Sequence, residues 1–375
     1  MSTARRALGW LKSQPVLTVA ALAALFSMLF VPPNPGYAGY FSWHTLLCLF
    51  AMLAVLNGFR QLGAFRALAS VLVERFSTLR AVILVLVLVT FFGSMFLTND
   101  MVLLTFLPLT AMVLSSCGQK KHILFAFVMQ TLAANLGGMI LPFGNPQNLF
   151  LFSYYELDLT QFVSALLMPF AISFVLITVI CLVAVKPTPL ALGAVDVPSF
   201  DRRKFAALLA LFAAVVLMVF DVVPNVAGAA GVAVALLALD RGDALRRVDY
   251  ALLATFACFF VFSGNLANIP AVQHLLQNLL AQGAFVPALS ASQVVSNVPA
   301  AVLIAPFTSD WQGLLLGADI GGLGTVIASL ASLITLAQFN RCIPGQTAKF
   351  LLAFTIFNVA FLAVLVTAVH VAGLV

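Results

Sequence analysis

Long apolar runs separated by short polar segments make up most of the chain. Runs such as 81–97, 162–185 and 350–369 approach or reach the roughly 17 to 25 residues that a membrane-spanning helix needs. Strands of a membrane barrel would instead alternate apolar and polar positions. The pattern therefore predicts an all-α polytopic membrane protein. We place its spans at residues 15–31, 40–58, 122–153, 161–185, 205–223, 226–239, 250–268, 312–339 and 350–372.

Two further apolar segments, 81–116 and 285–307, each carry a polar sequence in the middle. The first reads FLTND over residues 96–100, and the second reads VVSNV over residues 294–298. A polar tip between two apolar arms is typical of a re-entrant hairpin, which reaches membrane depth only where neighbouring helices bury it. We therefore expect two such hairpins.

The predicted span 122–153 is interrupted by helix-breaking residues. Gly137, Gly138 and Gly144 lower the helix propensity, and Pro142 and Pro146 each remove a backbone donor. Irregular backbone inside a membrane survives only where it is packed in protein or lines a cavity. The segment predicts a broken helix at a binding site. A kink that serves packing alone is the alternative interpretation.

The two halves of the chain carry related sequences in the same order. Residues 96–109 align with 294–307, pairing Asn99 with Asn297, and residues 134–149 align with 318–333, pairing Asn135 with Asp319. We expect two inverted repeats, each with a re-entrant hairpin and a broken transmembrane helix, and helix 205–223 as the extra span that inverts the second copy. The first repeat covers 1–185 (hairpin 81–116, broken helix 122–153), a cytoplasmic linker covers 186–204, and the second repeat covers 205–375 (hairpin 285–307, broken helix 312–339).

Composition agrees with a membrane location, and charge predicts the orientation. Hydrophobic residues make up 63% of the chain and charged residues 8%, with a mean hydropathy of +1.13. If the hairpins do not cross, all 18 Lys and Arg residues fall on the side of the N-terminus. The positive-inside rule then predicts a multi-pass protein of the inner (plasma) membrane with a cytoplasmic N-terminus and an external C-terminus. The pI of about 9.3 reflects this orientation, and we expect no nucleic-acid partner.

Three further features complete the prediction. Residues 57–80 carry apolar positions at helical spacing with arginines between them, which predicts an interfacial helix on the cytoplasmic surface. The charged start of the chain is not followed by a small-residue cleavage site, so we expect the first span to be retained. The five cysteines form no C-x-x-C pair, so neither a disulfide framework nor a metal cluster is indicated.

Helix breaks also carry chemistry, because half-helix N-termini favour anions and half-helix C-termini favour cations. The hairpin tips add uncharged oxygen ligands of the kind that suit sodium, namely Thr98, Asn99, Ser296 and Asn297. Asn145 and Asn148 contribute further oxygens at the first break.

Two acidic residues, Asp100 and Asp319, fall at membrane depth, and both lie inside the repeated elements. An ionisable residue there is energetically costly and marks a proton or cation site. A neutral, hydrogen-bonded acid retained for packing is the alternative. We expect no Lys or Arg at this depth, so an anionic substrate would have to be neutralised by helix dipoles and co-bound cations.

These motifs resemble the Ion Transporter superfamily, which contains divalent anion/sodium symporters, arsenite permeases and NhaD-type sodium/proton antiporters. The segments TND, ANLGG-x4-FGNPQN, SNVPAAVLIAP and GGLGTVIASLASL are most similar to the arsenite permease/NhaD branch, including anion permeases with a citrate-transporter-like domain. The resemblance covers residues 40–340 and implies a homodimer whose site lies at the hairpin tips and helix breaks. The residues that carry over are Thr98, Asn99, Asp100, Gly137, Gly138, Gly144, Asn145, Pro146, Ser296, Asn297, Gly321, Gly322 and Gly324.

The symporter branch of that superfamily has Ser-Asn-Thr at both tips, whereas this chain has Thr98-Asn99-Asp100 and Ser296-Asn297-Val298. The acid at the first tip favours proton or cation coupling over a doubly negative ligand. The sequence therefore predicts a secondary active, sodium- or proton-coupled permease for a small inorganic or organic anion that works by alternating access in the lipid bilayer. The alternative is a sodium/proton antiporter that uses Asp100 and Asp319. We expect no catalytic residues and no cofactor besides a sodium ion.

Overall fold

A computed structural model describes residues 14–190 and 200–375 of the chain. Within these ranges the regular elements are all helices, and the single β-bridge joins Thr78 to Pro189. The all-α prediction is thus confirmed. Six of the described helical stretches are long and apolar enough to cross a membrane, and five of them coincide with spans among the nine that the sequence predicted. The sixth, Asn99–Ser116, is an arm of the first predicted hairpin, and the predicted spans 15–31, 205–223, 226–239 and 312–339 are not among the six. Residues 1–13 and the part of the predicted linker at 191–199 lie outside the described residues.

The first half contains eight α-helices of four residues or more among the described residues. Their bounds are α2 (Pro15–Ser27), α3 (Trp43–Leu62), α4 (Ala64–Glu74), α5 (Leu79–Gly93), α6 (Asn99–Ser116), α7 (Ile123–Gly137), α8 (Pro146–Tyr154) and α9 (Leu159–Ala184).

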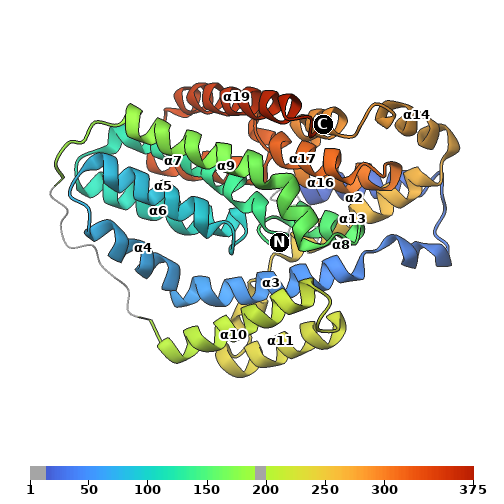
Figure 1. Cartoon of the computed structure of the whole chain (residues 1–375). Coiled ribbons are helices and arrows are strands. Elements are labelled where there is room, and N and C mark those ends of the chain that lie inside the picture. Colours follow the sequence, from blue (N-terminus) through green and yellow to red (C-terminus); the bar gives the residue numbers. More distant parts are fainter. Residues whose placement is uncertain (1–13, 191–199) are drawn as a thin grey trace, which may run out of the picture.

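The second half begins with the extra helix α10 (Arg202–Val219) and then follows the same series (Figure 1). The remaining helices are α11 (Asn225–Asp240), α12 (Asp243–Arg246), α13 (Tyr250–Ala267), α14 (Pro270–Leu280), α15 (Phe285–Val295), α16 (Asn297–Ile304), α17 (Trp311–Gly321), α18 (Leu330–Cys342) and α19 (Thr347–Val371). The order of a long helix, an amphipathic helix, a helical hairpin, a broken helix and a final long helix occurs twice.

Helix packing links the two halves reciprocally. α2 packs against α13 of the second half, and α11 packs against α3 of the first half. In Figure 1, α10 and α11 lie below α3. In each half, the helix that precedes the repeated order (α2 or α11) packs against the first long helix of the other half, as expected if the two halves are related. The inverted relation between the halves stays a prediction.

The segments predicted as hairpins and broken helices each contain two α-helices whose outer ends lie within a few residues of the predicted bounds. α5 and α6 form the hairpin predicted at 81–116, and α15 and α16 form the one predicted at 285–307. The broken helix 122–153 consists of α7 and α8, and the broken helix 312–339 consists of α17 and α18. By length alone α6 could cross a membrane, so the re-entrant path of the hairpins stays a prediction.

The surface segment predicted at 57–80 is shorter than expected. α3 continues to Leu62 and ends at Gly63, whose φ of +68° is the left-handed conformation that glycine adopts readily. The amphipathic helix α4 covers only the middle of the predicted segment. Its counterpart α14 was not predicted at all, because its eleven residues are too few and too polar to look like a span.

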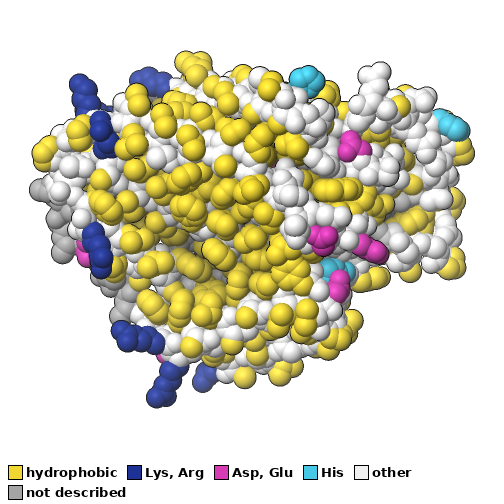
Figure 2. Space-filling model, viewed as in Figure 1, with side chains coloured by type: hydrophobic (Ala, Val, Ile, Leu, Met, Phe, Trp, Pro, Cys, Tyr) yellow, Lys and Arg dark blue, Asp and Glu magenta, His cyan; other side chains and the backbone are white. Residues whose placement is uncertain are grey.

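The surface in Figure 2 has a polar pattern that fits a membrane protein. The Lys and Arg side chains in view gather at the left, and the His and most acidic side chains lie toward the right. A hydrophobic surface fills the space between them. This separation is what two membrane faces with a basic cytoplasmic side would produce.

Candidate functional site

The tip of the first hairpin and the first helix break border one cavity of about 300 Å³. Thr98 and Asp100 line it from the start of α6, and Pro146 lines it from the start of α8. A cavity of about 200 Å³ shares Gln14, Asp249 and Leu252 with the first one and reaches Ser296 at the tip of the second hairpin. The structure therefore brings both hairpin tips to adjoining cavities.

Two helices begin at the larger cavity without a side-chain cap. Thr98 is the N-cap of α6 and Asn145 is the N-cap of α8, and neither side chain accepts a hydrogen bond from its helix. The first amides of an uncapped helix point along the axis and carry the positive end of the helix dipole. Their convergence on one cavity creates an environment that favours an anion.

The second hairpin turns at Ser296 in an unusual backbone conformation. Its φ of +77° and ψ of +153° lie outside the regions that residues with a Cβ prefer, a strain of about 1 to 3 kcal/mol. The Ser296 hydroxyl donates to the carbonyl of Ala328 over 3.3 Å, which ties this tip to the second helix break. Gln293 of α15 reinforces that contact by donating to the carbonyls of Gly321 and Leu323 over 2.8 and 2.9 Å.

Asn135 connects three elements of the site. Its Oδ1 accepts hydrogen bonds from Asn99 Nδ2 over 3.1 Å and from the Ser329 hydroxyl over 2.9 Å. One residue of the first broken helix thus holds the first hairpin tip and the start of α18. Its own Nδ2 has no partner among the described residues. A buried donor of this kind is available to a ligand or to water.

Asp319 lies in the interior of α17, with 2% of its surface exposed. Its Oδ1 accepts a hydrogen bond from Gln147 Nε2 over 3.0 Å, whereas its Oδ2 has no partner among the described residues. The side-chain oxygens of Asn145, Gln147 and Asn148 are also buried without a partner there. Four unpartnered oxygens on two neighbouring breaks suit a proton or a hard cation such as sodium.

The predicted sodium ligands divide between two places. Thr98 lines the larger cavity and Ser296 the smaller one, while Asn99 and Asn297 hydrogen bond within the protein. Asn297 Oδ1 accepts from the backbone amide of Val298 over 3.0 Å. A single sodium site made by all four residues stays a prediction.

The glycines of the two breaks allow close packing against the hairpins. A Cβ on Gly137 would overlap the carbonyl oxygen of Phe91 and lie 2.7 Å from the Ser94 hydroxyl. A Cβ on Gly321 would lie 2.9 Å from the Ser292 hydroxyl, the corresponding position of the second hairpin. Each broken helix thus meets its own hairpin through the same glycine–serine contact.

The following glycines are equally crowded. A Cβ added to Gly138 would lie 2.6 Å from Asn145 Oδ1. A Cβ added to Gly322 would lie 2.9 Å from Asn297 Nδ2. A Cβ on Gly144 would overlap the carbonyl of Gly138, and Gly324 has a φ of +101°. These glycines shape the breaks, so their contribution to the site is to position other groups.

Arginine lines the larger cavity, which the sequence did not predict, and the absence of Lys and Arg at membrane depth stays a prediction. Arg60 and Arg247 line the larger cavity together with Thr98 and Asp100. Arg60 was missed because α3 was expected to end near residue 58, whereas it continues to Leu62 and carries Arg60 in its last turn. Gln147, Gln293 and Ser329 were also missed, although Gln147 lies within the recognised motif GNPQN.

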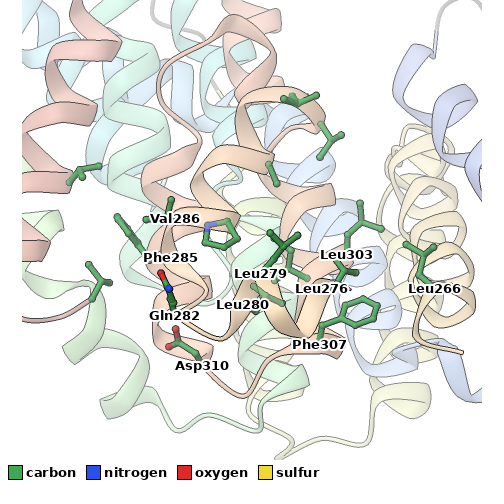
Figure 3. A pocket seen from close by; sticks show the side chains of 18 of the residues that line it. Leu266, Leu276, Leu279, Leu280, Gln282, Phe285, Val286, Leu303, Phe307 and Asp310 are labelled. Atoms are coloured by element: carbon green, nitrogen blue, oxygen red, sulfur yellow. The ribbon is translucent and has the colours of Figure 1, made fainter. Parts of the chain in front are cut away.

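A larger pocket of about 950 Å³ lies away from these residues, beside α14 and α15. Figure 3 shows Leu276, Leu279 and Leu303 along it, with Gln282 and Asp310 at one end. Its lining is almost wholly apolar, and the starts of α15 and α17 that meet there are already capped, because Asp310 accepts from the amides of Ala284 and Gly313. The chemistry for an ion is therefore concentrated at the tips and breaks.

Comparison with known proteins gives concordant results. A family model described as "Citrate transporter" (CitMHS) matches residues 8–313. "Inner membrane protein YbiR" of Escherichia coli K12 is 31% identical over 318 residues, which cover 83% of this chain and 84% of that protein. "Uncharacterized transporter MJ0456" of Methanocaldococcus jannaschii is 29% identical over 325 residues, covering 86% and 88% of the two chains.

A shorter similarity extends to the "Putative transporter arsB" of Dictyostelium discoideum, which is 30% identical over 109 residues. This match covers 29% of the present chain and 19% of that protein. Together these matches confirm the resemblance to permeases of the Ion Transporter superfamily that the hairpin and break motifs indicated.

Proposed function

Because the chain belongs to the citrate transporter family, we propose that this integral membrane transporter carries a small inorganic or organic anion by ion-coupled alternating access. The observation that carries the proposal is the shared cavity at the uncapped starts of α6 and α8. The positive ends of two helices and their free amides stabilise negative charge without a dedicated side chain.

Coupling to sodium or a proton follows from the acids at the site. Asp100 faces the same cavity as the two helix starts, so an ionised Asp100 would repel a bound anion. A cation or a proton that binds together with the anion removes this repulsion. The unpartnered oxygens around Asp319 supply a second place where such an ion would be stabilised. We include in the proposal the homodimer, the cytoplasmic N-terminus and the external C-terminus.

A thermal-shift screen of the purified protein tests the proposal, because a ligand that binds only the folded state raises the melting temperature. The screen compares citrate, phosphate, sulfate and uncharged arsenous acid, each with and without sodium and over a range of pH. We expect at least one anion to stabilise the protein, and to do so more strongly with sodium or at low pH. If none of the anions shifts the melting temperature under any of these conditions, the proposal fails.

The second candidate function is sodium/proton antiport, which the burial of Asp319 and its unpartnered Oδ2 favour. In an antiporter the acid itself binds the transported ion in turn with a proton. Sodium-dependent proton flux in vesicles without any added anion would support this function. If such vesicles show no flux at any pH, antiport is excluded and anion transport remains.

A further inference from the structure

The larger cavity continues into a recess that carries positive charge. This recess measures about 290 Å³ and is lined by Asn57, Arg60, Gln61 and Arg247. Three of these four residues, Asn57 and the two arginines, also line the cavity at the hairpin tip. Two guanidinium groups therefore line both the recess and the cavity that holds Thr98 and Pro146.

The two guanidinium groups are available to a ligand. Arg60 forms no ion pair with the described residues, and its side chain is exposed. Arg247 has 64% of its side chain exposed, and its one acidic neighbour, Asp243, lies 3.9 Å away at the outer limit of an ion pair. Asp243 is at the same distance from Arg246, so it is shared. Exposed pairs of this length contribute little and leave Arg247 free to exchange partners.

The protein holds these arginines next to each other through Asn57. This buried residue of α3 lies one helical turn before Arg60, and its Nδ2 donates to the backbone carbonyl of Arg247 over 2.9 Å. The bond fixes the segment after α12 against the end of α3. Two guanidinium groups held on one recess match the planar, paired oxygens of carboxylate, phosphate and sulfate.

The two acids of the larger cavity, Asp100 and Asp249, do not line the recess. Asp249 is the N-cap of α13, and its Oδ1 accepts from the amide of Leu252 over 2.9 Å. Asp100 lines the deeper cavity together with Thr98 and is absent from the recess lining. The charged side chains that line the recess are therefore all positive, whereas the adjoining cavity is lined by both arginines and both acids.

We propose that Arg60 and Arg247 form an oxyanion-binding site at the mouth of the cavity, where the anion is held before it reaches the starts of α6 and α8. The site deepens the proposed function and rests on it, because the bound anion is taken to be the transported one. Its ligand is a free anion with carboxylate, phosphate or sulfate oxygens. An anionic lipid headgroup presents the same oxygens, and the experiment separates the two sources.

The experiment follows arginine modification by phenylglyoxal in protein reconstituted in nanodiscs of a zwitterionic lipid. Mass spectrometry measures the reaction rate of each arginine with citrate, phosphate or sulfate, against chloride at equal ionic strength. We expect at least one of the three anions to slow modification of Arg60 and Arg247 about fivefold or more, as bound oxyanions shield guanidinium groups. Arg246, which is adjacent and exposed but lines neither cavity, is the matched control.

Several outcomes would overturn the inference. Equal protection of Arg246, protection by chloride alone, or no protection by any of the three anions would each contradict a specific site. Protection that appears only when anionic lipid replaces zwitterionic lipid would assign the arginines to a headgroup and contradict a free-anion site. Because this readout needs no transport, it remains informative if the proposed function fails.

A transport arm asks whether the site serves the translocated anion. Arg60→Gln and Arg247→Gln should raise the KM for anion uptake about tenfold or more, the effect of losing a hydrogen bond to a charged group. Arg246→Gln should leave the KM unchanged, and Arg247→Lys should restore part of the affinity. Unchanged KM values in both cavity variants would show that the arginines do not bind the transported anion.

Discussion

Gln147 of the first broken helix donates a hydrogen bond to Asp319 of the second over 3.0 Å. The two residues are 172 positions apart, and each belongs to a break that interrupts a long apolar helix. The contact joins the halves of the chain at a buried carboxylate. A proton or a cation bound at this carboxylate would therefore change the contacts of both broken helices.

Replacing Asp319 by Asn tests this carboxylate. The amide keeps the size of the side chain but cannot carry the charge that attracts a cation. We expect ion-driven transport to fall by about tenfold or more, as when a coupling free energy of about 1 to 3 kcal/mol is lost. This fall is measured as the rate of uptake under an imposed sodium or proton gradient.

Asp158→Asn is the control for Asp319, because Asp158 is an exposed acid that caps helix α9 by accepting from the amide of Gln161 over 2.8 Å. Asn caps helices about as well as Asp, so this variant should fold and transport normally. If Asp319→Asn transports like the wild type, the carboxylate takes no part in coupling.

Gly137→Ala tests the contact between the first break and its hairpin. The added methyl group would overlap the carbonyl oxygen of Phe91, so we expect destabilisation of about 1 to 3 kcal/mol. Gly231→Ala is the control, since its Cβ would meet nothing within 4 Å on helix α11. Thermal unfolding in detergent should show a lower melting temperature for the first variant only. Equal melting temperatures would mean that the close contact is absent.

Asn135→Ala should lower both stability and the transport activity of the protein that still folds. The change removes the acceptor for Asn99 and Ser329, leaving two buried donors without a partner at a cost of about 1 to 3 kcal/mol each. Asn358→Ala is the comparison, because that buried amide bonds only to Phe354 of its own helix. The measurement is uptake per folded protein, and equal residual uptake in the two variants would deny Asn135 a role in the site.

Thr98→Cys, made in a background without the five native cysteines, reports which side the cavity faces. Thr98 shares its cavity with Arg60 and Arg247, which belong to the basic side of the molecule. A membrane-impermeant maleimide should therefore label the new cysteine from the cytoplasmic side. A transported anion should lower the labelling rate. Labelling only from outside would reverse the predicted orientation.

The hairpins and breaks could be predicted because they violate the pattern around them. Polar tips such as Thr98 and Asn99, and glycine and proline inside an apolar run, interrupt the pattern of a regular membrane helix and so indicate a hairpin or a break. The bounds of these elements were accordingly close to those observed. Helix α14 was not predicted because a short amphipathic helix contains no polar or helix-breaking residues within a long apolar run.

Tertiary partners could not be read from the sequence. Nothing in the spacing of Gln147 and Asp319 indicates that they meet, and Asn57 gives no sign of its bond to the carbonyl of Arg247. Arg60 was not expected at the site because α3 was predicted to end at residue 58, whereas it continues to Leu62. Arg247 was assigned to a cytoplasmic loop, and its contact with Asn57 of α3 is tertiary.

Accumulation of a labelled anion in proteoliposomes tests the central claim most directly. Citrate and the anion that best stabilises the protein are offered with an inward sodium gradient, with an inward proton gradient, or with neither. We expect uptake above the equilibrium level under one gradient, and we expect that level to collapse when the gradient is dissipated. Failure of every anion to accumulate, together with gradient-driven sodium–proton exchange in the same vesicles, would contradict the central claim.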